Sequence, residues 1–393
     1  MMEITKEMKK TDIYIGETKG KDIFIDTENV ANQHMLVTGS TGTGKTNFLK
    51  VWLSQNVTRQ TVVLDYSDSF PQFENAETIS IFETSEIQGF FSDLTPDTLG
   101  STADAIVGAW RLGEAQRATV IKALNNLMHQ KDFSEIISMA SADIFRPYLR
   151  ENSDSYEKSW SLFATILNCK CGYKGEQIAT RLLELVNAAS KSKISDKEKS
   201  INAAAVKIVK FPVESCGLNA YLAELYLWKF WMKELKERNP VTVILDECQD
   251  LNWKKGSIAE RLLSQGRKFG IGIVLSTQFL SENFPKRIIN HFQQSGVRVV
   301  FAPPEGEAKE IAQSFDATNW KKWVTTLKWL RVGCCAACGQ LKVNGRSSKQ
   351  KVIVSVPSYE EFIQDMEKGR GKDTKNQPKT SATEIFTKWK GQK

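Results

Sequence analysis

Runs of apolar residues divide the chain into expected strands and helices. From Thr11 to Asp26, apolar and polar residues alternate around a Lys-Gly-Lys turn, which predicts a short β-hairpin. Continuous apolar runs, which are typical of the buried strands of a parallel sheet, follow further along the chain. These runs are His34–Thr38, Thr61–Tyr66, Thr78–Phe82, Val241–Leu245, Ile271–Ser276 and Val297–Phe301.

Helical periodicity fills the intervals between these runs. Apolar residues recur at i, i+3, i+4 and i+7 from about Asp93 to Asn202, which predicts a helical insertion of about 110 residues. Near the end, Val332–Val343 and Lys351–Val356 are expected to pair as a closing hairpin. Strands alternating with helices predict an α/β fold whose parallel sheet is covered on both faces. The shorter helices are expected at Lys45–Gln55, Ser257–Lys268, Lys286–Gln293 and Glu305–Phe315.

Length and composition allow this architecture. With 393 residues, 41% of them apolar, the chain can bury a large core and carry an insertion. No signal peptide and no apolar run of about 18 residues are visible, so no membrane association is expected. Seven cysteines, an odd number, favour free thiols and a cytoplasmic protein. The expected parts are an N-terminal hairpin segment (1–33), a core (34–92 and 203–356), the helical insertion (93–202) and a basic tail (357–393).

Positive charge gathers at the end of the chain. The net charge is +7, and the last 25 residues contain seven Lys or Arg residues against only Asp373 and Glu384. A basic tail on a nearly neutral body fits a polyanionic partner such as DNA. Such tails are more often only solvated, so this feature alone does not decide for nucleic acid.

A glycine-rich loop stands between the first buried run and the first helix. Gly39–Thr46 matches G-x-x-x-x-G-K-[ST] at every fixed position, in the strand–loop–helix context that the motif requires. Its backbone N–H groups can point at one phosphate, and the helix N-terminus adds positive potential. Lys45 is expected to reach the β- and γ-phosphate oxygens, and the Thr46 hydroxyl to bind Mg²⁺. The expected ligand is therefore ATP with Mg²⁺, held by Gly39, Ser40, Thr41, Gly42, Thr43, Gly44, Lys45 and Thr46.

Two carboxylates follow the apolar run Val241–Leu245. Asp246 and Glu247 would lie at the carboxyl edge of a parallel sheet, where ligands bind in open α/β folds. Asp246 suits the outer sphere of the metal, and Glu247 suits a base that polarises an attacking water. Many surface strands also end in acids, but the glycine-rich loop favours a hydrolase site here.

Gln278 and Arg267 flank the run Ile271–Ser276. The Gln278 amide, beside the strand of Asp246, can hydrogen-bond the γ-phosphate or the attacking water. Arg267 comes earlier, at the end of a helix, from where it can reach a neighbouring subunit as an arginine finger. The alternative for Arg267 and Lys268 is a charge pair that complements the helix dipole.

These residues together resemble the HerA/FtsK family of hexameric DNA-translocating ATPases, closest to its HerA side. The resemblance rests on HMLVTGSTGTGKTNFLK, VILDECQDL and LLSQGRKFGIGIVLSTQF in this order. Asp65–Phe70 is similar to a degenerate form of the family's Asp-x-x-Gly-Glu-Tyr turn, and Gly113–Arg117 to its helical Gln-Arg element. The resemblance implies a RecA-like P-loop NTPase core, a homohexameric ring with duplex DNA in its channel, and a nuclease or other effector as partner. Arg267 matches the trans-acting arginine of related conjugative coupling ATPases.

The chain also departs from the family's DNA-repair members. Only 33 residues precede His34, so we do not expect the N-terminal β-barrel that helps those proteins dock their nuclease. Relatives without the barrel often come from mobile elements or antiviral defence operons, and that setting is our hypothesis. Two functions remain open: a DNA motor driven by ATP hydrolysis, and a nucleotide-gated scaffold for an effector. Glu247 and Arg267 favour the motor, whereas a small-molecule kinase would have no use for Gln278.

Cysteines and tryptophans offer two further interpretations. A zinc site would need two C-x₂-C pairs, or Cys with His, and Cys335 and Cys338 stand inside an apolar run without such partners. Buried thiols are the favoured explanation for them and for Cys169 and Cys171. A tryptophan- and lysine-rich stretch could stack bases, but its spacing favours a helix with one apolar face packed on the core. Its tryptophans are Trp320, Trp323 and Trp329.

Overall fold

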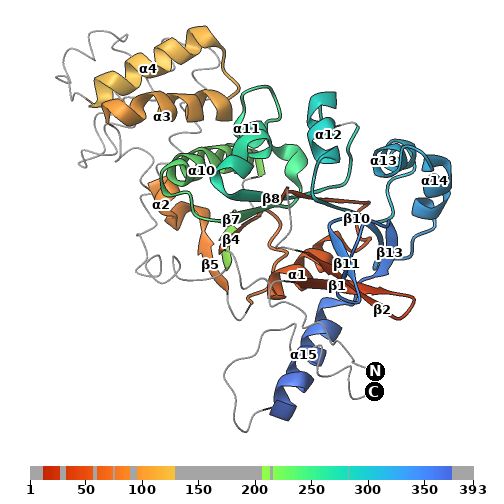
Figure 1. Cartoon of the computed structure of the whole chain (residues 1–393). Coiled ribbons are helices and arrows are strands. Elements are labelled where there is room, and N and C mark those ends of the chain that lie inside the picture. The colour runs from red at the N-terminus through yellow and green to blue at the C-terminus, as the bar shows by residue number, and fades with distance from the viewer. Residues whose placement is uncertain are drawn as a thin grey trace.

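A computed structural model gives the fold of most of the chain (Figure 1). It describes residues 12–26, 32–55, 60–73, 76–88, 95–128, 206–212, 216–281 and 283–373. Most of the expected insertion, the cysteines Cys169 and Cys171, and the tail beyond residue 373 lie outside the described residues. The described part is built on one sheet of 13 strands.

The sheet has a parallel half and an antiparallel half. Its strand order is β12-β11-β2-β1-β13-β10-β9-β3-β8-β7-β4-β6-β5, and the strands from β9 to β5 run parallel. The strands from β12 to β10 pair antiparallel. The parallel strands are β3 (Met35–Thr38), β4 (Gln60–Asp65), β5 (Ala76–Ser80), β6 (Val206–Lys210), β7 (Val241–Leu245), β8 (Ile271–Thr277) and β9 (Val297–Val300). The antiparallel strands are β1 (Ile13–Thr18), β2 (Lys21–Ile25), β10 (Cys334–Gly339), β11 (Leu341–Val343), β12 (Arg346–Ser348) and β13 (Val352–Ser355).

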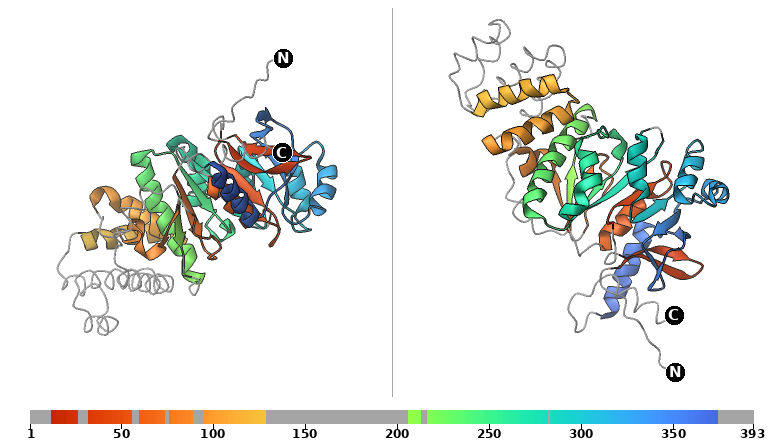
Figure 2. Two further views of the ribbon diagram at one scale, coloured as in Figure 1. Left: turned by 90° about the horizontal axis from the view of Figure 1, so that it is seen from below. Right: turned by 45° about the horizontal axis from the view of Figure 1, so that its top comes forward.

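Helices cover both faces of the parallel strands, as Figures 1 and 2 show. On one face α1 buries Phe48 and Leu49 against the sheet. On the other face, α10 and α11 lie in a second apolar cluster, with the hairpin of α3 and α4 beyond α10. The helices are α1 (Lys45–Gln55), α2 (Ser85–Gln88), α3 (Pro96–Ala109), α4 (Glu114–Met128), α10 (Cys216–Glu237), α11 (Ile258–Gln265), α12 (Lys286–Gln293), α13 (Ala308–Phe315), α14 (Trp320–Lys328) and α15 (Tyr359–Asp373). Short 3₁₀ helices are η1 (Ile81–Glu83), η3 (Cys248–Asp250) and η4 (Gly266–Phe269).

The central strands are mainly apolar because both of their faces are covered. All five residues of β7 are buried, and alternate side chains enter opposite clusters: Val243 and Leu245 one, Ile244 the other. This explains why continuous apolar runs, rather than alternating ones, predicted the parallel strands. Each predicted buried strand is present within two residues of its expected limits, and the expected pairing of the closing hairpin is found between β10 and β13.

The N-terminal hairpin and the end of the chain are parts of the same sheet. β1 pairs with β13, and β2 pairs with β11, which the sequence pattern did not predict. Gly16 (φ +137°) stands at a bulge in β1, where an added Cβ would come within 2.1 Å of the Ser355 carbonyl oxygen. Lys342 on β11 is buried and donates to Asp12 at 2.6 and 2.8 Å. A buried cation with a matched carboxylate pins this register, since an unpaired charge there would be costly.

The expected basic tail begins as an ordered helix. α15 buries Phe362 and Met366 in an apolar cluster with the hairpin residues Tyr14 and Phe24. Asn47 on α1 holds its start, donating to the Pro357 carbonyl at 2.8 Å and accepting from the Tyr359 N–H at 2.8 Å. The apolar residues of this segment are sparse among charges, so the sequence pattern did not reveal the helix.

Candidate nucleotide-binding site

The glycine-rich loop connects β3 to α1 at the carboxyl edge of the sheet. The Ser40 N–H donates to the Ala302 carbonyl at 2.8 Å, which fixes the loop to the end of β9. Gly39 has φ +152°, and an added Cβ would lie 2.6 Å from the Phe301 Cβ. Only glycine fits this close approach, so the first fixed position of the motif has a direct steric cause.

Lys45 begins α1 and folds back over the loop. Its Nζ donates to the carbonyls of Gly39 at 2.8 Å and Ser40 at 3.1 Å, and the side chain is buried. Burial lowers the pKa of Lys45, while Glu247 and Asp246 act in the opposite direction. The ammonium of Lys45 thus lies within the curve of the glycine-rich loop, where a phosphate would be held.

Asp246 follows β7 and faces the hydroxyl of Thr46. The Thr46 Oγ1 lies 3.5 Å from the Asp246 Oδ2. Burial, with a smaller contribution from Glu247, raises the pKa of Asp246. A nearby cation would favour its charged form. A hydroxyl and a carboxylate are hard oxygen ligands of the kind that Mg²⁺ takes, so these two residues fit a magnesium ion.

Glu247 is joined to the glycine-rich loop by a chain of hydrogen bonds. The Gln278 amide nitrogen donates to both carboxylate oxygens of Glu247, at 3.0 and 3.1 Å. The Thr41 hydroxyl donates to the Gln278 amide oxygen at 2.7 Å. Glu247 itself has a left-handed backbone (φ +50°), which is unusual for a non-glycine residue. Glu247 and Gln278, which were both expected beside the γ-phosphate, are thus joined to each other and to the glycine-rich loop.

Gln249 is a site residue that sequence reasoning missed. Its amide nitrogen donates to the Glu247 Oε2 at 2.6 Å, and its amide oxygen accepts from the Thr277 hydroxyl at 3.1 Å. Gln249 therefore links the Glu247 carboxylate to Thr277 at the end of β8. Its position two residues after Glu247 could have suggested a role in the site. Only the η3 turn, however, brings its side chain back to the Glu247 carboxylate.

Arg267 lies at the other edge of the sheet. It is exposed in η4, which precedes β8, whereas Gln278 follows β8. Because β8 has seven residues, its two ends are separated by about 20 Å. Arg267 therefore cannot act on a nucleotide held by the loop of its own chain.

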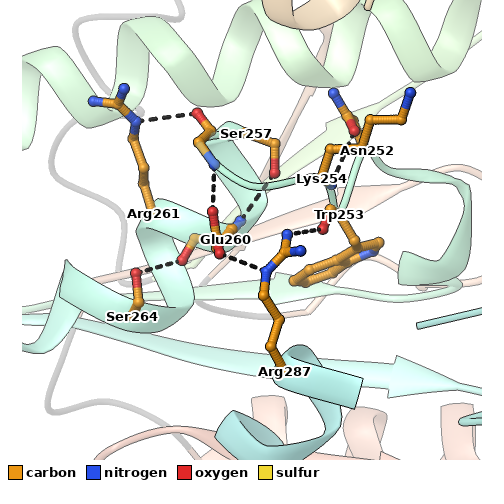
Figure 3. A network of polar contacts seen from close by, with 9 residues as sticks. Asn252, Trp253, Lys254, Ser257, Glu260, Arg261, Ser264 and Arg287 are labelled. Carbon is orange, nitrogen blue, oxygen red and sulfur yellow. Dashed lines mark hydrogen bonds and ion pairs between the residues drawn. The ribbon is translucent and has the colours of Figure 1, made fainter. Parts of the chain in front are cut away.

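The segment after Glu247 is held against the helices (Figure 3). Arg287 on α12 donates to Glu260 on α11 at 2.8 Å and to the Trp253 carbonyl at 2.7 Å. Asn252 donates its backbone N–H to Glu224 on α10 at 2.7 Å and its side chain to the Gly108 carbonyl at 3.2 Å. Through these contacts, α3 and α10 are joined to the segment that follows Glu247.

Glu224 predicts a pH dependence of stability. Burial raises its pKa from 4.5 to about 8, although the Asn252 N–H and Arg111 lower it. The stability that protonated Glu224 contributes is complete below the unfolded pKa and is lost as pH rises through about 8. Glu224→Gln keeps an acceptor for Asn252 without a titrating proton, so its melting temperature should exceed that of the wild type by a few degrees at pH 9.

Thermal unfolding from pH 5 to pH 9 tests this expectation. The Tm difference between Glu224→Gln and the wild type should widen as pH rises. Glu237→Gln, at an exposed position of the same helix, is the matched control and should follow the wild type at every pH. Parallel curves for Glu224→Gln and the wild type would contradict the raised pKa.

The tryptophan and cysteine interpretations have different outcomes. Trp320 and Trp323 pack on the apolar cluster as predicted, but the core prediction for Trp329 is wrong, because its side chain is 81% exposed. Trp329 comes nine residues after Trp320, on the opposite side of a helix with 100° per residue, and follows the end of α14. Cys335 and Cys338 are buried free thiols whose side chains enter opposite clusters.

β3, the glycine-rich loop and α1 place Lys45 and Thr46 beside Asp246, which follows β7 of the same parallel sheet. This arrangement defines a RecA-like P-loop NTPase fold. The chain belongs to the family described as helicase HerA, central domain, which it matches over residues 13–212. This match includes the glycine-rich loop and ends before Asp246. No curated protein matches the sequence.

Solved structures share the fold at low sequence identity. VirB4 of Thermoanaerobacter pseudethanolicus is 11% identical with a TM-score of 0.56, over 88% of this chain and 97% of that one. The bacterial conjugative coupling protein TrwBdeltaN70 is 13% identical with a TM-score of 0.54, over 87% and 89%. The plasmid coupling protein TrwB in complex with ADP and Mg²⁺ is 12% identical with a TM-score of 0.50, over 84% and 87%. No helix among the described residues is long and apolar enough to span a membrane.

Proposed function

We propose that this protein is an ATP-hydrolysing, ring-forming DNA translocase or helicase-like motor. The observation that carries the proposal is the hydrogen-bonded chain from Thr41 through Gln278 to Glu247. It joins the loop that would hold the triphosphate to a carboxylate placed to polarise water. A protein that only stored nucleotide would not need a base aligned in this way.

Each residue has a distinct part in the proposed reaction. The backbone N–H groups of Gly39–Thr46 and the ammonium of Lys45 bind the phosphates. Thr46 and Asp246 would hold Mg²⁺, which would supply positive charge to the phosphate oxygens. Glu247 accepts hydrogen bonds from Gln278 and Gln249, which orient its carboxylate toward an attacking water. Gln278 can exchange its Thr41 partner for the γ-phosphate or its water, and so carry the nucleotide state into β8.

Family membership and the shared fold support the coarser part of the proposal. TrwB has been described with ADP and Mg²⁺, which supports the same ligands here. A homohexamer around duplex DNA, a nuclease or effector partner, and a role in antiviral defence or mobile elements are the finer parts. They rest on the resemblance to the HerA/FtsK family and on the position of Arg267, from which it could act on a nucleotide only in a second subunit.

DNA-stimulated turnover tests the motor against the scaffold. The motor predicts that ATP hydrolysis rises when duplex DNA is added and that streptavidin is displaced from a biotinylated end in an ATP-dependent manner. The scaffold predicts ring formation with ATP but a turnover that DNA does not change. Turnover insensitive to DNA under conditions where the ring forms on it would refute the motor.

Lys45→Ala is expected to lower Mg-ATP affinity by about two orders of magnitude, because the phosphates lose the ammonium of the loop. Isothermal titration with ATP measures the change. Lys50→Ala, on the same helix α1 but outside the loop, is the control and should bind as the wild type does. Equal affinity for ATP in Lys45→Ala would remove the phosphate site from this loop.

A further inference from the structure

Two large apolar side chains that are close in sequence, Trp329 and Val332, are exposed to solvent. Trp329 is 81% exposed and Val332 is 77% exposed. Among the described residues, the other large apolar side chain classed as exposed is Ile353, at 42%. The cost of hydrating an indole ring calls for an explanation at this position, since both tryptophans of α14 itself pack on the core.

The turn that carries Trp329 and Val332 ends at Gly333, which contacts the glycine-rich loop. The Gly333 N–H donates to the Thr43 carbonyl at 3.1 Å. An added Cβ on Gly44 would lie 3.4 Å from the Gly333 Cα, which is van der Waals contact. The exposed segment is therefore an immediate neighbour of the residues that would hold the phosphates.

The backbone of this segment is held at both ends. The Trp329 N–H donates to the Thr326 carbonyl at 3.2 Å, and the Cys334 N–H donates to the Arg331 carbonyl at 2.9 Å. Cys334 then enters β10, which pairs with β9. Trp329 and Val332 are thus presented on a fixed turn, so little ordering would be needed when a ligand packs on them.

The order of the strands in the sheet indicates which end of a bound ATP would lie near the turn Trp329–Gly333. β7 and β8, which carry Asp246, Glu247 and Gln278, lie on one side of β3. β9 and β10 lie on the other side, and Gly333 precedes β10. The γ-phosphate must lie toward Glu247, so the α-phosphate and the nucleoside lead away from it, toward β10.

We propose that Trp329 and Val332 form a platform for the base of the bound nucleotide. The indole ring offers a flat face for stacking, and Val332 adds an apolar contact. This proposal rests on ATP being the ligand of Gly39–Thr46. The platform binds the part of the ligand that the phosphate loop does not contact, so it contributes to affinity and not to the chemistry of the phosphates.

Comparison of ATP with inorganic tripolyphosphate separates the platform from the phosphate loop. Isothermal titration in Mg²⁺ is done on the wild type, Trp329→Ala, Trp329→Phe and Val332→Ser. Trp329→Ala should weaken ATP binding about tenfold and leave tripolyphosphate binding unchanged. Trp329→Phe keeps a stacking ring and should recover most of the loss. Ile353→Ala, at the third exposed apolar position, should bind both ligands as the wild type does.

Each other outcome has a defined meaning. Equal ATP affinity in Trp329→Ala and the wild type would refute the platform. Equal loss of ATP and tripolyphosphate would also refute it, since the effect would then come through the loop. A change confined to oligomer size in sedimentation would assign Trp329 to contacts between subunits instead. If the wild type bound neither ATP nor tripolyphosphate, the nucleotide site itself would be overturned.

Discussion

Replacing Glu247 by glutamine is expected to abolish ATP turnover while ATP binding survives. Thr46 and Asp246 remain to hold Mg²⁺, and Lys45 remains for the phosphates. The amide oxygen of the new side chain, in the place of Oε2, can still accept from Gln278 and Gln249, so two of the three hydrogen bonds to this side chain are kept. Only the ability to polarise water is lost, which we expect to lower kcat by about 10²–10⁴.

Steady-state phosphate release and ATP titration measure the two halves of this prediction. Asp250→Asn is the matched control, because it removes a nearby carboxylate of the same η3 turn at an exposed position. It should retain turnover. A Glu247→Gln variant that hydrolyses ATP within about threefold of the wild type would place the base on another residue.

Removing the Arg267 guanidinium is expected to lower turnover by about 10³–10⁵, because finger contacts act on charge that develops in the transition state. ATP binding should persist. Arg267 lies at the opposite edge of the sheet from Gln278, so it would complete the site of a neighbouring chain. Hydrolysis by the wild type should then rise with protein concentration as rings form. Lys268→Ala, at the adjacent exposed cation, should keep most of the turnover.

Mixing two inactive variants tests whether Arg267 acts between chains. A ring containing both Arg267→Ala and Glu247→Gln chains has some interfaces where an intact Glu247 meets an intact Arg267. Partial recovery of turnover is therefore expected in the mixture. No recovery, when sedimentation confirms mixed rings, would exclude the finger.

The arrangement of the candidate site could be predicted from the sequence because it depends on local spacing. A buried strand, a tight glycine turn and a helix are adjacent in the chain, so Lys45 and Thr46 must stand at a helix N-terminus beside the loop. Asp246 and Glu247 follow an apolar strand, and parallel strands place their carboxyl ends at one edge. Gln278 follows a second such strand and was expected at the same place.

Other elements escaped because their signals depend on distant partners. β6 contains Lys207, which interrupts its apolar pattern, and the buried ammonium is compensated by Glu86 at 3.5 Å. The sequence pattern could not show that this lysine has a carboxylate 121 positions away. The same holds for Lys342, whose partner Asp12 stands near the other end of the chain.

The sequence by itself determined the glycine-rich loop, the two acids after an apolar strand and the parallel core, since each follows from the order of residues within a single segment. The tertiary structure decided which residues meet across segments. It brought Gln249 and Gln278 onto Glu247, set Arg267 at the far edge of the sheet, and left Trp329 exposed beside the loop. Such contacts depend on strand order and on the direction in which each turn leaves the sheet. Neither property is encoded in the local alternation of apolar and polar residues.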